Sequence, residues 1–114
     1  MSRRKRAWLM KLFDAVPVVL MAGLWLASAA AAGDAVASRG AALANACAAC
    51  HGPGGRSQGA IPSIDTLPAE DFIMALKAFR ADTRQGTVMN RIAKGLDDTE
   101  ISATAAYFAS RRGR

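Results

Sequence analysis

Two cysteines and one histidine lie together in the segment Cys47-Ala48-Ala49-Cys50-His51. At this spacing each thiol can add across one vinyl group of a haem to form a thioether, and the adjacent imidazole can bind the iron. We therefore predict one covalently bound haem c, with Cys47 and Cys50 as its attachment points and His51 as the proximal iron ligand.

Other interpretations of this motif remain. A structural zinc site normally needs four Cys or His ligands, and the chain holds two cysteines and one histidine in total, so zinc is disfavoured. A disulfide between Cys47 and Cys50 would close a very small loop and constrain the unfolded chain little. A haem-free thiol–disulfide protein is the remaining alternative, although such motifs usually follow a strand.

The iron needs a second axial ligand, and no second histidine exists in the chain. A methionine thioether is the usual alternative. The only methionines outside the first 32 residues are Met74 and Met89. We predict that Met89 is the distal ligand, whereas Met74, within an expected helix, fills a gap in the core. We also expect the Pro62 carbonyl to accept a hydrogen bond from His51. An open sixth position, suited to ligand binding, is the alternative.

The residues around Met89 include two polar side chains close to the expected sulfur ligand. Thr87 and Asn90 flank Met89 closely in the sequence. One hypothesis is that either side chain polarises the methionine sulfur by a hydrogen bond.

The first 32 residues have the pattern of an export signal. A basic start is followed by an apolar run over 15–26 and by alanines and a serine over 27–32 that offer A-x-A cleavage frames. We predict a signal peptide over 1–32, an uncleaved anchor being the alternative, and a mature monohaem domain over 33–114 located in the periplasm. After cleavage no membrane span is expected.

Charge excludes one class of partner for the mature domain. The chain has 15 basic and nine acidic residues. Positions 1–32 hold five of the basic residues but only one of the acidic residues, Asp14. The mature domain is therefore nearly neutral, and nucleic-acid binding, which needs a basic stripe, is not expected. So small a domain gains stability from a bound cofactor that fills its interior.

Helical signals account for most of the mature chain. An alanine-rich stretch predicts a helix over 35–46, and apolar spacing predicts a second from 68 to about 81. A short helix is expected over 88–94. The last helix should run from Asp97 to about 111, because Asp97 and Glu100 form a capping box. The fold class predicted is all-α, with three to four helices around one covalent haem.

Taken together, these features resemble the class I cytochromes c over nearly the whole mature chain. In that family a glycine of the N-terminal helix packs against an aromatic residue of the C-terminal helix, and Gly40 and Tyr107 match that pair. The resemblance assigns the proline carbonyl to Pro62 and the methionine ligand to Met89. It implies an electron-transfer protein rather than an enzyme.

A narrower resemblance is to the small haem subunit of flavocytochrome c sulfide dehydrogenase. It is carried by the haem motif, by Phe72-Ile73 with 76–80, and above all by the segment 87–95, Thr-Val-Met-Asn-Arg-Ile-Ala-Lys-Gly. This resemblance implies a flavoprotein partner that oxidises sulfide and passes electrons through the haem. A free soluble shuttle between redox complexes is the alternative.

Basic residues lie in and around the segment expected to cover the Met89 side of the haem. They are Arg80, Arg84, Arg91 and Lys94. Such charges are either a solvated surface or a docking patch for an acidic partner.

Overall fold

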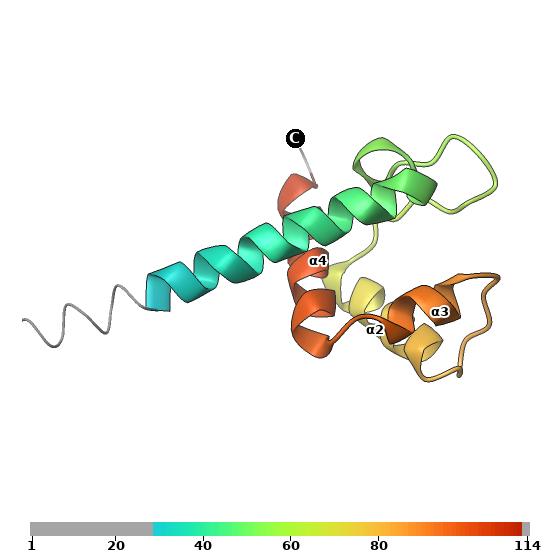
Figure 1. The fold of residues 1–114 in the computed structure, drawn as a ribbon. Helices are drawn as coiled ribbons and strands as arrows, with labels where there is room; N and C mark the ends of the chain where they lie inside the picture. The colour runs from blue at the N-terminus through green and yellow to red at the C-terminus, as the bar shows by residue number, and fades with distance from the viewer. Residues whose placement is uncertain (1–28, 113–114) are drawn as a thin grey trace, which may run out of the picture. The chain divides into compact units, whose positions relative to one another are not determined.

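The computed structural model describes residues 29–112 (Figure 1). The chain divides into two structural units, Met1–Asp34 and Ala35–Arg114, and the second holds every predicted haem-site residue. The predicted leader lies largely outside the described residues, which include only 29–32 of it, and it stays a prediction. Within 29–112 no helix combines the length and the hydrophobicity needed to cross a bilayer.

The described part of the chain is helical, as the sequence predicts. An N-terminal helix covers residues 29–51 and is followed by the short 3-10 helix η1 (Pro53–Gly55). The remaining elements are α2 (Ala69–Arg80), α3 (Met89–Lys94) and α4 (Asp98–Arg111), and no strand occurs among residues 29–112 (Figure 1). The all-α fold prediction is confirmed.

The final helix, α4, begins where the capping box predicts. The Glu100 backbone N–H donates to Asp97 Oδ1 at 2.8 Å, and the Asp97 backbone N–H donates to Glu100 Oε2 at 3.1 Å. Four residues at helical spacing then form its buried face: Ile101, Thr104, Ala105 and Phe108. This face packs α4 into the core of the domain.

Helix α2 packs against both α3 and α4. Its buried positions, Phe72 and Leu76, are one turn apart and so lie on one face of the helix. The Phe72 ring contacts the ring of Phe108 at a centroid distance of 5.5 Å. These aromatic contacts join the two helices in a small core.

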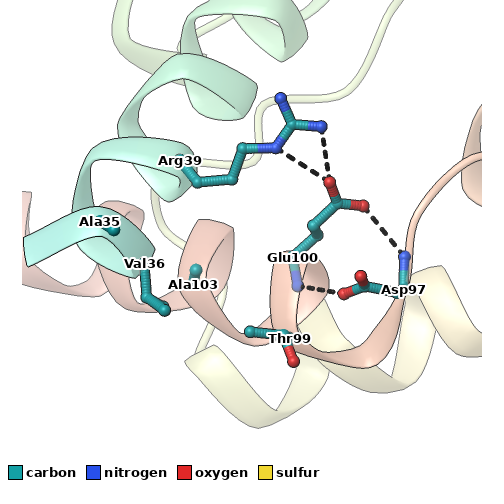
Figure 2. A pocket seen from close by; sticks show the side chains of 7 residues that line it. All are labelled: Ala35, Val36, Arg39, Asp97, Thr99, Glu100 and Ala103. Atoms are coloured by element: carbon teal, nitrogen blue, oxygen red, sulfur yellow. Dashed lines mark hydrogen bonds and ion pairs between the residues drawn. The ribbon is translucent and has the colours of Figure 1, made fainter. Parts of the chain in front are cut away.

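The N-terminal helix meets α4 at two points, which Figure 2 shows in part. Arg39 Nε and Nη2 both donate to Glu100 Oε1, at 2.9 and 2.6 Å. One residue later, Gly40 lies directly against the backbone of Ala103. Ala44, one turn further along, is buried in the core.

The family resemblance pairs Gly40 with Tyr107, and the closest approach at Gly40 is to Ala103. The three atoms nearest to a Cβ built on Gly40 all belong to Ala103. Tyr107 lies one turn further along α4, where its ring packs edge-on against Phe108 at 5.6 Å and beneath the Arg111 guanidinium. The glycine thus serves a backbone-to-backbone approach, because a small Ala103 side chain leaves room for the two helices.

Candidate haem site

The cysteines and the histidine of the motif lie on the last turns of the N-terminal helix. Cys47 and Cys50 are three residues apart, so both thiols lie on the same side of the helix. Neither forms a disulfide; Cys47 is half-buried against the core and Cys50 is exposed. Burial raises the pKa of the Cys47 thiol, which keeps this sulfur protonated at neutral pH.

The imidazole of His51 is oriented by the loop that follows the helix. His51 is 9% exposed, and its Nδ1 lies 2.6 Å from the backbone oxygen of Pro62. A carbonyl oxygen accepts hydrogen bonds and donates none, so Nδ1 must carry the proton. The lone pair is then on Nε2, where a metal ion can bind it. The structure brings Pro62 to the ring that the sequence analysis pairs with it.

The loop carrying Pro62 is held in place by hydrogen bonds within the segment 55–64. The Ile64 N–H donates to the Gly55 carbonyl oxygen at 2.8 Å, and the Ser57 N–H donates to Ser63 Oγ at 2.9 Å. Gly55 itself is buried against Phe108 of α4 and Ile64. The last helix therefore supports the loop that orients His51.

The two candidate methionines differ sharply in their surroundings. Met89 is the first residue of α3, is half-buried and packs against the core. Met74 is 61% exposed, so the expectation that it fills a gap in the core is wrong. The reason is helical geometry: α2 buries Phe72 and Leu76, and position 74 falls on the opposite face.

Exposed apolar side chains adjoin the predicted ligands. Ile61 precedes Pro62 and is 44% exposed, Val88 precedes Met89 and is 56% exposed, and Ile92 follows on α3 at 46%. Large apolar side chains left in water beside the predicted ligands along the chain suit contact with an apolar macrocycle. The donor set and its surroundings therefore fit a covalently attached haem.

The polar atoms of Asn90 are all engaged within the protein. Its side-chain nitrogen lies near the backbone oxygens of Phe79 and Arg84, and its side-chain oxygen accepts from the Gly86 N–H. The hypothesis that Asn90 polarises the Met89 sulfur is therefore not supported. This bridging role depends on atoms of residues 79–86, so residue type and spacing alone do not predict it.

Two of the four basic residues near Met89 form ion pairs with neighbouring carboxylates. Arg80 and Lys77 contact Asp98 and lower its pKa, chiefly through the Arg80 hydrogen bond. Lys94 contacts Asp82, and its hydrogen bond is the main reason that the pKa of Asp82 is lowered. The Arg84 guanidinium lies 4.7 Å above the Phe79 ring.

A separate open groove of about 280 Å³ lies between the N-terminal helix and α4 (Figure 2). Its lining is mostly apolar, with Val36 and Ala103 beside the Arg39–Glu100 ion pair. None of its lining residues belongs to the haem motif.

These features are those of a small c-type cytochrome, and comparison with known proteins agrees. The Cytochrome c family profile matches residues 37–112, so the chain belongs to the cytochrome c family. Membership implies covalently bound haem c and a role in electron transfer, and Cys47, Cys50 and His51 lie in the attachment motif that this family requires. A haem-free thiol–disulfide protein is therefore no longer retained as an alternative.

Among characterised relatives, the cytochrome subunit of sulfide dehydrogenase from Chlorobaculum tepidum is 44% identical over 73 residues, covering 64% of this chain and 66% of that protein. The thiosulfate dehydrogenase electron acceptor of Stutzerimonas stutzeri is 38% identical over 68 residues, 56% of this chain and 32% of that protein. Cytochrome c-554(548) of Halomonas halodenitrificans is 36% identical over 83 residues, 69% of this chain and 98% of that protein.

The chain thus matches less than two thirds of the length of the first two relatives. The predicted resemblance to class I cytochromes c, close to the cytochrome subunit of sulfide dehydrogenase, is confirmed.

Proposed function

We propose that this protein is an exported, periplasmic monohaem electron carrier that acts as the non-catalytic haem subunit of a flavoprotein sulfide dehydrogenase. The 44% identity to the cytochrome subunit of a sulfide dehydrogenase supports this partner. The observation that carries the electron-transfer role is the His51 Nδ1 to Pro62 oxygen distance of 2.6 Å, because it leaves Nε2 free for a metal.

In this proposal each site residue has one role. Cys47 and Cys50 form the two thioether links to the haem, His51 is the proximal iron ligand and Met89 is the distal ligand. Pro62 orients the His51 ring through its carbonyl. When bound, the haem supplies a one-electron couple between ferric and ferrous iron. If His51 and Met89 both bind the iron, no coordination position would remain for a substrate.

The ligand assignment is tested by the visible spectrum of the holoprotein. Ferric iron bound to a methionine sulfur has a weak far-red absorption band. Met89→Ala should abolish this band, whereas the matched variant Met74→Ala should leave it unchanged, because Met74 is 61% exposed on the outer face of α2. Persistence of the band in Met89→Ala would contradict the assignment.

The partner assignment is tested by co-purification from the native organism and by haem reduction. A stable complex with a flavoprotein, in which added sulfide reduces the haem, supports the proposal. An acidic partner surface would be met by Arg84 and Arg91, since Arg80 and Lys94 are already paired. Association should then slow sharply as the salt concentration rises.

A free soluble electron shuttle is a second candidate function. It is supported by the likeness to cytochrome c-554(548), to which this chain is similar over 98% of that protein's length. A monomeric holoprotein at every purification step, unable to bind a flavoprotein, would support the shuttle and overturn the sulfide dehydrogenase assignment.

A further inference from the structure

The segment between α2 and α3, residues 82–88, is here called the distal loop because it leads directly to Met89. Its first residues fold back onto the end of α2: the N–H groups of Thr83 and Arg84 both donate to the Ala78 oxygen, at 3.0 and 3.2 Å. Asp82 has a φ of 57°, a left-handed conformation that is strained for a residue other than glycine. Contacts elsewhere must therefore hold this loop in shape.

The side-chain amide of Asn90, in the first turn of α3, supplies several of those contacts. Its Nδ2 lies 3.0 Å from the Phe79 oxygen, 2.8 Å from the Arg84 oxygen and 3.1 Å from Asp82 Oδ1. Its Oδ1 accepts from the Gly86 N–H at 2.9 Å. One side chain thus joins the end of α2, three residues of the distal loop and α3.

The chemistry of these four contacts selects asparagine. The three partners of Nδ2 are all oxygens, and the partner of Oδ1 is an N–H group. The site therefore needs a donor with two protons and an acceptor on one short planar group. Aspartate has the same shape but cannot donate when ionised. A second link from α3 lies one turn later, where Lys94 Nζ donates to Asp82 Oδ2 at 2.7 Å.

Met89 packs against the core, but no side-chain cap holds the start of its helix. Val88, the residue that precedes α3, makes no side-chain capping hydrogen bond. The distal loop instead packs directly on Met89, since a Cβ added to Gly86 would lie 3.3 Å from the Met89 Cβ. Met89 is therefore in contact with the distal loop, and Asn90 makes three hydrogen bonds to that loop.

We propose that Asn90 is the positioning residue for the second iron ligand: its amide holds the distal loop so that the Met89 sulfur stays bound to the haem iron. This inference rests on the proposed role of Met89 as the distal ligand. Asn90 acts through the loop and does not contact the iron. Its loss should weaken the iron–sulfur bond while the helices and the covalent haem attachment are retained.

The test compares Asn90→Ala and Asn90→Asp in the full-length holoprotein. Asn90→Asp keeps the shape and the acceptor for Gly86 but loses the donors to Phe79 and Arg84. Both variants should lose most of the far-red band of the ferric protein. Carbon monoxide should also bind the ferrous form at least about tenfold faster than in the unsubstituted protein, because several hydrogen bonds supporting the ligand are gone.

Two controls separate this role from general destabilisation and from the ligand assignment. Arg39→Gln removes an ion pair between the N-terminal helix and α4 and should keep the band. If Arg39→Gln loses the band as well, general destabilisation explains the result and the inference is wrong. If the unsubstituted protein has no band, or Met89→Ala keeps it, the proposed function fails instead.

If the band is present and requires Met89, but both Asn90 variants match the unsubstituted protein in band and carbon monoxide rate, the inference about Asn90 is overturned. Should Asn90→Ala fail to fold with haem, Asn90→Ser is titrated with guanidinium. Its far-red band should then disappear at a lower denaturant concentration than its helical circular dichroism. Coincident transitions, as in a two-state loss of the whole fold, would contradict the inference.

Discussion

Gly40 lies so close to Ala103 that a Cβ added to the glycine would be 2.5 Å from the Ala103 carbonyl oxygen and 2.7 Å from its carbonyl carbon. This approach sets the position of the N-terminal helix on α4. The same N-terminal helix carries Cys47 and His51 at its other end, and α4 carries Phe108, which supports the loop holding Pro62. One helix crossing thus helps to position both sides of the proximal site.

Replacing Gly40 by alanine should destabilise the holoprotein. The new methyl group would clash with backbone atoms, which cannot move aside as a flexible side chain can, so the helices must separate. We expect a loss of about 1–3 kcal/mol in the free energy of unfolding, measured by guanidinium titration. The control is Gly59→Ala, where an added Cβ meets nothing within 4 Å and little change is expected. Equal stability of the two variants would contradict the close packing.

Gly55 and Gly54 offer a matched pair for testing the loop that orients His51. Both have positive φ, 86° and 64°, so alanine at either position costs about 1–2 kcal/mol in backbone strain. An added Cβ at Gly54 meets nothing, whereas at Gly55 it would lie 2.8 Å from Phe108 Cε1. Gly55→Ala should therefore cost about 1–3 kcal/mol more than Gly54→Ala in chemical unfolding. A difference near zero would show that this contact does not constrain the loop.

Glu100 should make stability depend on pH in the acid range. Its pKa is lowered, first by the Arg39 hydrogen bonds and then by the Asp97 N–H. Because the folded pKa is below the unfolded value of about 4.3, the ionised form stabilises the fold at higher pH. This contribution is lost as the pH falls through the folded pKa.

The variant Glu100→Gln isolates this effect, because glutamine retains a capping box but carries no charge. Its urea midpoint should be below that of the unsubstituted protein at pH 7, and the gap should close in acid. Arg39→Gln should remove most of the same pH dependence. The difference in urea midpoint between the two proteins could instead stay constant down to a pH below both the folded and the unfolded pKa of Glu100. That result would argue against the ion pair.

The ion pair between Arg56 and Asp65 should contribute to the stability of the fold. Arg56 Nε lies 3.0 Å from Asp65 Oδ2, and the Asp65 side chain is only 17% exposed. Its other oxygen, Oδ1, is buried and has no hydrogen-bond partner among the described residues. Arg56→Ala should therefore cost about 1–3 kcal/mol, because a largely buried charge loses its partner.

A second substitution provides the check. Adding Asp65→Asn to Arg56→Ala should restore part of the lost stability, because it removes the unpaired charge. If the double variant unfolds at a lower denaturant concentration than Arg56→Ala alone, the explanation by charge burial is wrong.

Signals that act over a few residues could be interpreted correctly from the sequence. The capping box of Asp97 and Glu100 places the start of α4, and both of its hydrogen bonds are present. The helix expected from position 68 is α2, which begins after Pro68. The exposure of Met74 was missed, although the spacing of Phe72 and Leu76 already puts position 74 on the other face of the helix.

Contacts between distant segments could not be derived in this way. Neither the packing of Gly40 on Ala103 nor the bridging role of Asn90 follows from residue type or spacing. Both depend on atoms brought together by helix packing, and the Asn90 contacts also depend on the backbone path of residues 79–86.

By itself the sequence determined the covalent chemistry, because attachment of haem needs two thiols and an imidazole at one short spacing along the chain. It also determined the helices, since caps and apolar periodicity are local. The tertiary structure alone decided which nitrogen of His51 is free, which neighbour meets Gly40 and what holds the loop before Met89. Those outcomes depend on hydrogen bonds and steric contacts between residues that the chain brings together only when it folds.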